Sequence, residues 1–354
     1  MKLIDTNAKT LSISDSVDSI RWNRLVASHN GPMQMTYEWI AYVCAKDGVR
    51  PLFFENSRHD GSFIAVTYLS SPKRWPLSKW PTASTDCIPL AKNRVAAITD
   101  IEHVLRQKGV SDFQLNSFAF DGATPIELAT LGYEENARCE FALSLNAGLE
   151  TAWLGMRPTL RSDIRRFERS GLDCRIRTDE DIVEALHHIE QETALRHRAQ
   201  GKLGKPMQEA TYRAIWECLV KTGRARVYMA EKHGIGVASV VIGVCGTNAY
   251  YLYGGASPDG LSLNAPKGLL WFAIQEEYAK GVREFNLGGM SATAQQPDSL
   301  DHGLYKFKTG FGGTERLCVS GHKVFRPRLL ETKARLLSLA RHVRGVLNTH
   351  RDRD

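Results

Sequence analysis

The sequence lacks any apolar stretch long enough to cross a bilayer. Its N-terminal residues, MKLIDTNAKTLSISDS, contain one lysine and no apolar core, which argues against a secretory signal. We therefore expect a cytoplasmic protein, and a peripheral position at the inner face of the membrane remains open.

Several common site motifs are also missing. The seven cysteines are scattered without a C-x-x-C pair, which argues against a disulfide framework and a zinc site. There is no Gly-x-Ser-x-Gly elbow, P-loop or dinucleotide fingerprint, so hydrolase, NTPase and Rossmann interpretations lack support. We expect no bound metal and no tightly bound cofactor.

Charge is present but uneven. The chain of 354 residues carries a formal net charge of +7. Residues 323–354 contain nine Lys/Arg and three Asp/Glu, and residues 157–177 contain seven Arg and three acids. Such basic patches suit phosphate-bearing partners: tRNA, nucleotide-sugars, coenzyme A or an anionic membrane, with no indication of DNA. A pair of solvated helix faces would give the same pattern.

An internal repeat organises the sequence. Residues 108–115 read KGVSDFQL and residues 280–287 read KGVREFNL. Each copy follows a helical pattern, over about 93–108 in the first case and 266–280 in the second. Pro266 suits the first turn of a helix, and Gly281 suits its C-terminal cap.

Each half also contains helical material followed by antiparallel strands. Residues 51–71 predict a β-hairpin and residues 225–257 a three-stranded meander. The order helix, helix, meander, helix, strand resembles the N-acetyltransferase (GNAT) superfamily. This resemblance implies an α/β (α+β) fold of two tandem GNAT-like domains, each a mixed, mainly antiparallel sheet flanked by helices.

The predicted domain boundary lies near residue 150. We assign residues 1–150 to an N-terminal domain that ends in a strand over 138–145, and residues 151–327 to a C-terminal domain. The second domain opens with a basic helix over 153–170, broken by Pro158. Residues 328–354 predict a basic amphipathic helix and tail, which could pack on protein, on a partner or on a membrane surface.

The segments RSDIRRFERSG (161–171), YYLYGGASPDG (250–260) and GLYKFKTGFGG (303–313) resemble the FemAB-like branch of this superfamily, including BioF2-like relatives. Members of that family transfer an aminoacyl group from a charged tRNA to an amine of a peptidoglycan precursor. The resemblance implies the same class of reaction here, and it is poorly specific for the substrate.

Within GLYKFKTGFGG, the family places a Phe-Lys pair at the reaction centre. The pair matches Phe307 and Lys308, so the resemblance makes Lys308 the cation that stabilises the reacting carbonyl. A fixed cation beside an oxyanion lowers the barrier to acyl transfer by about 3 kcal/mol. We expect this run to be strand-like, with Lys306 and Lys308 on one face and Phe307 on the other. Solvent-facing lysines on a strand would give the same pattern.

Further residues are candidates for substrate binding. Arg161 and Arg165 lie four apart on one helical face and could hold phosphates, as could a merely solvated linker face. Asn264 begins the helix over 266–280, where anions bind readily. The other candidates lie within residues 250–313, where the resemblance is concentrated: Tyr253, Gly288, Gly289, Tyr305 and Gly310. Glycines there allow close backbone approach, or simply form turns.

The donor is open between two classes. Coenzyme A-using acetyltransferases place a glycine-rich loop before this helix, whereas residues 262–268 read SLNAPKG, and Pro266 removes an amide donor. The basic surfaces and the missing loop suit aminoacyl-tRNA, and the superfamily at large suits acyl-coenzyme A or an acyl carrier protein. No general base is identified; Glu140, Asp301, His302 and Tyr305 are possible by residue type.

The sequence thus predicts an N-acyltransferase acting on an amine of a cell-envelope, peptidoglycan or polysaccharide-related acceptor, including nucleotide-sugar-linked ones. The alternative is a non-catalytic GNAT-fold module that docks RNA or an anionic membrane through its basic surfaces.

Overall fold

The computed structural model describes residues 2–3, 11–57, 62–70, 80–118, 120, 128–199, 201 and 207–327. The predicted C-terminal helix after residue 327 lies outside this part of the chain. Within it, no helix combines the length and hydrophobicity that a membrane span requires.

The first half supplies eight strands and three α-helices. The strands are β1 (Lys2–Leu3), β2 (Leu11–Ser14), β3 (Val49–Asn56), β4 (Phe63–Ser70), β5 (Ala83–Thr85), β6 (Leu90–Ala91), β7 (Asp112–Leu115) and β8 (Glu134–Ser144). The helices are α1 (Ser19–Ser28), α2 (Tyr37–Asp47) and α3 (Arg94–Gln107), with short 3-10 turns η1 (Met33–Met35) and η2 (Leu128–Leu131).

In the second half a helical region is followed by a three-stranded antiparallel meander, as expected. Its helices are α4 (Leu149–Gly155), α5 (Pro158–Glu168), α6 (Ile182–Ala199), α7 (Glu209–Ala214), the π-helical η3 (Ile215–Val220), α8 (Pro258–Ser262), α9 (Ala265–Ala279), the 3-10 turn η4 (Ala292–Gln295) and α10 (His302–Gly310). Its strands are β9 (Asp173–Arg177), β10 (Ala225–Lys232), β11 (Ile235–Cys245), β12 (Asn248–Ala256), β13 (Glu284–Ser291) and β14 (Thr314–Val324).

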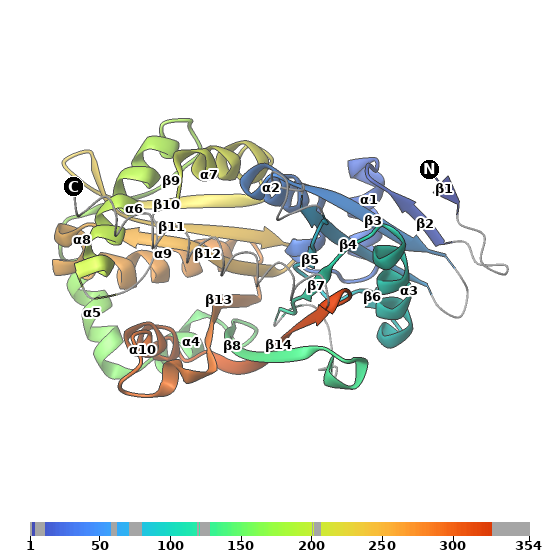
Figure 1. Cartoon of the computed structure of the whole chain (residues 1–354). Helices are drawn as coiled ribbons and strands as arrows, with labels where there is room; N and C mark the ends of the chain where they lie inside the picture. Colours follow the sequence, from blue (N-terminus) through green and yellow to red (C-terminus); the bar gives the residue numbers. More distant parts are fainter. Residues whose placement is uncertain are drawn as a thin grey trace, which may run out of the picture.

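All of these strands join one mixed, mainly antiparallel sheet flanked by helices. Its order is β1-β2-β3-β4-β5-β7-β14-β8-β13-β12-β11-β10-β9, and β6 pairs with β4. The red strand β14 runs back from α10 to the teal strands of the first half (Figure 1). There it pairs antiparallel with both β7 and β8. The sheet therefore continues across the predicted boundary near residue 150.

The repeated sequences form equivalent strands. Both α3 and α9 end before a glycine in the left-handed region, Gly109 (φ 77°) and Gly281 (φ 99°). Glycine adopts this conformation at low cost, so the chain can turn sharply into the next strand. Those strands, β7 and β13, then pair in parallel with β5 and β12 respectively. The predicted helix-to-strand units at 93–115 and 266–287 are thereby confirmed.

Apolar packing joins the two halves. One buried cluster combines Trp22, Met33 and Tyr42 of the first half with Ile215 and Tyr250 of the second. A second cluster surrounds α9, which packs beneath β10, β11 and β12. The halves therefore share a core, and their contact is not confined to a linker.

Two local expectations need correction. The run over 303–310 is helix α10 and not a strand. Residues two apart in a helix lie on different faces: Lys308 is buried, whereas Lys306 is exposed. The strand predicted over 138–145 exists as part of β8, but both of its neighbours, β13 and β14, come from the second half.

Candidate functional site

The site begins where β12 and β13 separate. These strands pair in parallel only between Asn248–Tyr250 and Glu284–Asn286, although both continue further. Beyond Asn286 the pairing of β13 with β8 also shifts its register, and Gly288 adopts φ 83°. This bulge ends the regular ladder and opens the space between the two strands.

Lys308 fills that space from helix α10. Lys308 is only 4% exposed, and its Nζ donates a hydrogen bond to the carbonyl of Gly289 at 2.9 Å. A Cβ atom placed on Gly288 would lie 3.0 Å from this Nζ and 3.4 Å from the carbonyl oxygen of Tyr251. Glycine at 288 therefore serves two needs, the positive φ and the close approach of the ammonium group.

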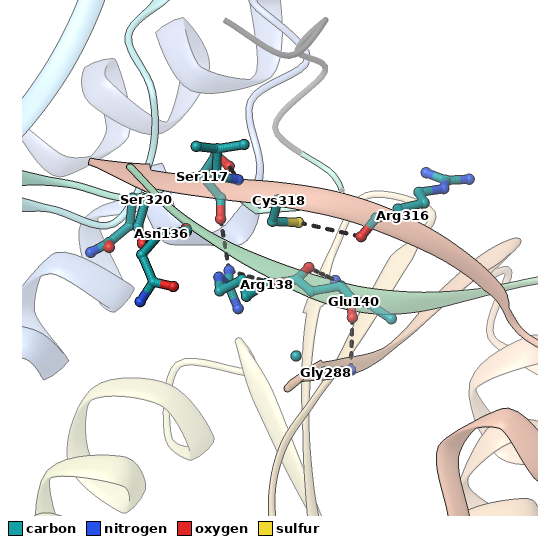
Figure 2. Close-up of polar contacts among 12 residues, drawn as sticks. Ser117, Asn136, Arg138, Glu140, Gly288, Arg316, Cys318 and Ser320 are labelled. Atoms are coloured by element: carbon teal, nitrogen blue, oxygen red, sulfur yellow. Dashed lines mark hydrogen bonds and ion pairs between the residues drawn. The ribbon is translucent and has the colours of Figure 1, made fainter. Parts of the chain in front are cut away.

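A buried polar network supports the bulge. The Asn286 side chain accepts a hydrogen bond from the Gly288 amide at 2.7 Å and donates one to Glu140 at 2.7 Å. Arg138 donates to the other Glu140 oxygen at 2.5 Å and to the carbonyl of Ser117 at 2.7 Å. Figure 2 shows Arg138 and Glu140 side by side on β8, close to Gly288. A strand from the first half thus fixes the backbone that contacts Lys308.

Burial and nearby charges set the protonation of Lys308. Burial lowers its pKa to about 8, helped by Arg138, while the Glu140 and Asp301 carboxylates oppose this shift. At pH 7 about nine in ten of these side chains are still charged, from the one-unit difference between pH and pKa. The site therefore presents an ammonium ion in a low-dielectric environment, which suits stabilisation of a developing oxyanion.

A cavity of about 650 Å³ lies beside this centre. It is bounded by α6, the middle of β11, the C-terminal part of β12, the start of α9, and α10. Its lining includes Tyr251, Gly254, Gly255, Pro266, Leu304 and Phe307. Phe307, next to Lys308 in the chain, forms part of its wall.

Other predicted residues on α10 are nearby. Tyr305 packs edge-to-face on Phe141, at 6.0 Å between ring centroids, and stacks on His302. Gly310 accepts a backbone hydrogen bond from Arg157 at 2.9 Å, which joins the end of α10 to the start of α5. Gly310 therefore has a packing role in the structure.

Helix α5 packs against one side of the start of α9. Asn264 precedes the helix in the left-handed region (φ 58°), and Lys267 donates to its side chain at 3.3 Å. Lys267 also forms an ion pair with Asp163 of α5 at 2.7 Å. A Cβ atom on Gly268 would collide with the ring of Phe167. Helix α5 thus packs against this helix start, where a glycine-rich phosphate loop would otherwise lie.

The predicted arginines lie on α5. The Arg165 guanidinium sits over the ring of Trp153, 5.5 Å from its centroid, and lines a shallow hollow with Glu150, Glu168 and Trp271. None of these residues lines the cavity beside Lys308. Arg161, one turn earlier, is partly exposed. Their role in substrate binding stays a prediction.

Tyr253 of β12 joins the two halves. Its hydroxyl lies 2.5 Å from that of Tyr42 on α2. Among the proposed bases, Glu140 is held by Arg138 and Asn286, and His302 contacts the carbonyl of Ala294 at 3.4 Å. The part of the chain that the structure describes contains no group of three or more His, Cys, Asp or Glu side chains placed to hold a metal ion.

Comparisons with known proteins bear on the family and the fold. Residues 155–308 match the family model described as an acetyltransferase (GNAT) domain. The chain carries a GNAT-type acyltransferase domain. The match ends at Lys308 and leaves out β8 and β14, the strands that complete the GNAT domain's sheet on the far side of β13.

Solved structures extend the likeness to nearly the whole chain. FemX matches with a TM-score of 0.71 and 12% identity, over 91% of this chain and 99% of its own. A C-terminal domain of a putative lysylphosphatidylglycerol synthetase from Agrobacterium fabrum matches with a TM-score of 0.55 and 15% identity, over 90% of this chain and 96% of its own. A tandem GNAT protein from the clavulanic acid biosynthesis pathway matches with a TM-score of 0.50 and 13% identity, over 89% of this chain and 98% of its own. No curated protein matches the sequence.

At these identities the likeness shows the fold, which is the predicted tandem GNAT arrangement, consistent with the FemAB-like resemblance. Sequence reasoning missed the roles of Asn286 and Arg138 and gave Glu140 only as a possible base. A signal was present: Asn286 lies between Phe285 and Leu287 in one predicted strand, and Glu140 precedes the apolar run FAL in the other. A polar residue inside a buried strand needs a partner, and here the two are partners of each other.

Proposed function

We propose that the protein transfers an aminoacyl or other acyl group to an amine of a cell-envelope or polysaccharide-related acceptor. The observation that carries this proposal is the buried ammonium of Lys308 at the separation of β12 and β13, beside a cavity of about 650 Å³. One Lys308 proton is bonded to Gly289. An ammonium group has three protons, so two remain for a substrate oxygen.

The reaction is an attack on a carbonyl. The neutral amine forms a bond to the carbonyl carbon, and the carbonyl oxygen becomes an oxyanion that the Lys308 ammonium stabilises. The intermediate collapses by breaking the bond from carbon to the leaving oxygen or sulfur, and a proton passes from the attacking nitrogen to the leaving atom. Because Lys308 is already fixed and desolvated, little reorganisation is needed as charge develops.

Among donors, we favour aminoacyl-tRNA over acyl-coenzyme A. The support is the start of α9, where Pro266 removes an amide donor and Gly268 packs against Phe167 of α5. One fold neighbour is described as a putative lysylphosphatidylglycerol synthetase, and the product in that name is a phospholipid that carries an aminoacyl group. The exposed arginines of α5 offer a surface for phosphates.

The test compares two lysines on the same helix. Purified protein is incubated with pooled aminoacyl-tRNA or acyl-coenzyme A donors and envelope-precursor amines, and mass spectrometry detects acceptors that gain mass. Lys308→Met is expected to lower the transfer rate about 100-fold or more, as for loss of an oxyanion-hole donor. Lys306→Met, which changes an exposed side chain two residues away, should leave the rate unchanged.

Loss of activity in Lys308→Met should not reflect unfolding. Replacing a buried charge by an apolar side chain of similar length is often neutral or stabilising. Thermal melting of both variants checks this point. Transfer by Lys308→Met at the rate of the unmodified protein would contradict the proposal.

A further inference from the structure

Helix α5 carries a row of arginines that runs from the residue before the helix to the residue after it. Its members are Arg157, Arg161, Arg165, Arg166 and Arg169. Arg161 is partly exposed and the other four are fully exposed. Among the residues that the structure describes, no carboxylate forms an ion pair with any member of this row. The nearby Asp163 pairs instead with Lys267 of α9.

Other arginines of the second half are neutralised by acids. Arg175 and Arg177 of β9 share the buried carboxylate of Glu231, and Arg213 of α7 pairs with Glu180 and Glu209. Like charges four residues apart repel each other on a helix, so the α5 row disfavours its own helix while it stays unpaired. A polyanion laid along the row relieves this repulsion, because it supplies phosphates to several arginines at once.

The other side of α5 is occupied by the protein itself. Leu160, Ile164 and Phe167 are buried in the core that surrounds α9. Apart from Pro158, every exposed side chain of α5 is polar or charged. A helix that lies on a membrane needs an apolar face turned outward, and α5 has none to offer. The row therefore suits the phosphate backbone of a nucleic acid better than a lipid surface.

A hollow of about 370 Å³ opens beside the row. Trp153 of α4 and Trp271 of α9 lie in it with their ring centroids 5.4 Å apart, and the Arg165 guanidinium lies over the Trp153 ring. The other polar side chains that line it are Glu150, Glu168 and Gln275. Unpaired bases stack on aromatic rings and on guanidinium planes, while carboxylate and amide groups bond to their edges. The hollow thus has the chemistry to hold an unpaired base.

The row begins at the helix that carries Lys308. The Arg157 amide donates to the carbonyl of Gly310 at 2.9 Å, and its guanidinium donates to the carbonyl of Lys306 at 2.9 Å. Helices α5 and α10 accordingly lie side by side in Figure 1. From Arg157 to Arg169 the row is about 18 Å long, at the rise of an α-helix. That length matches about five nucleotides of a helical strand.

We infer that α5 docks the single-stranded 3′ end of the RNA that carries the acyl group. The arginines contact its phosphates, and the hollow at Trp153 takes one of its unpaired bases. The RNA then runs along α5 to α10, and its terminal ester enters the centre at Lys308. This inference rests on the proposed acyl transfer with aminoacyl-tRNA as the donor, and it adds the surface that binds the RNA.

The first experiment uses RNA without an acyl group. Fluorescence anisotropy measures binding of a labelled RNA hairpin with an unpaired 3′ end to the full chain, between about 50 and 200 mM salt. Arg165→Gln combined with Arg169→Gln is expected to weaken binding about tenfold or more at low salt. The slope of log affinity against log salt should fall by about two, one for each lost phosphate contact.

Two matched variants separate local contact from overall charge. Arg24→Gln combined with Arg50→Gln removes the same charge from exposed positions of the first half, and the salt slope should not change. Arg165→Lys combined with Arg169→Lys keeps both positive charges, so most of the slope should remain. A fall in slope that is equal in the α5 glutamine variant and the first-half variant overturns the inference.

A second experiment tests the hollow. Trp153→Leu should weaken binding of the hairpin with the unpaired 3′ end about fivefold or more, and it should leave binding of a blunt hairpin unchanged. A merely structural role of Trp153 predicts equal losses for both hairpins, which contradicts the base-binding role. Thermal melting checks that each variant is folded.

Two further outcomes overturn the inference as a whole. One is the absence of saturable RNA binding to the unmodified protein. The other is binding to phosphatidylglycerol vesicles, but not to RNA, that depends on Arg165 and Arg169. None of these measurements involves acyl transfer, and Lys308→Met should bind the hairpin like the unmodified protein. Failure of the RNA surface and failure of the proposed reaction are therefore distinguishable.

Discussion

Opposite charges on one strand should move the pKa of Lys308 in opposite directions. Glu140 raises this pKa and Arg138 lowers it, and both lie on β8. Neutralising Glu140 as Glu140→Gln should therefore lower the pKa below its value of about 8, and Arg138→Gln should raise it. A neighbouring charge shifts a pKa by about 1 unit or more, which sets the expected size.

The effect is largest near pH 8. There the unmodified site is about half charged, and a shift of one unit leaves about one in ten Lys308 side chains charged in Glu140→Gln and about nine in ten in Arg138→Gln. If the charged form carries catalysis, the transfer rate at pH 8 should fall about fivefold in Glu140→Gln, on the same arithmetic. In each variant, the pH at which the transfer rate declines on the alkaline side should shift together with the pKa of Lys308.

The pKa can be measured without substrate. Carbon NMR of protein labelled at lysine Cε follows each lysine during a pH titration, and the signal missing from Lys308→Met identifies Lys308. Glu134→Gln, on the same strand but exposed, serves as the control and should not shift it. Shifts of the same sign in Glu140→Gln and Arg138→Gln, or no shift in either, would refute the role assigned to β8.

Two further predictions concern stability and are measured by urea denaturation. Gly268→Ala places a methyl group into the ring of Phe167 and should lower the free energy of unfolding by about 1–3 kcal/mol. Gly303→Ala is the control: its Cβ has open space around it, so the free energy of unfolding should not fall. Lys323 Nζ donates to both Glu102 oxygens at 2.8 Å, and Glu102→Gln weakens this pair. The variant should lose about 3 kcal/mol of unfolding free energy. The double variant Glu102→Leu with Lys323→Met should recover much of that loss.

Local signals allowed much of the fold to be predicted. The helix expected over 266–280 is α9 (Ala265–Ala279), because Pro266 and Gly281 mark its two ends chemically. The two repeated strands were recognisable because each follows such a helix and a glycine turn. The burial of the Lys308 side chain could not be derived from local pattern, and the family resemblance alone singled that residue out.

Non-local contacts explain what was missed. The alternation Lys306-Phe307-Lys308 suggested a strand. Instead α10 forms, where Arg157, the residue before α5, donates to the Lys306 carbonyl at 2.9 Å and Lys308 enters the opened sheet. The partners of β8 are strands more than a hundred residues later in the chain.

The position of β14 has a consequence for synthesis on the ribosome. Until residues 314–324 emerge, β7 and β8 each lack the neighbour that lies between them in the finished sheet. Strand edges of this kind can pair wrongly with other chains. The nascent protein must therefore hold two incomplete sheet segments apart until β14 has been translated, and slow, late closure is the expected folding behaviour.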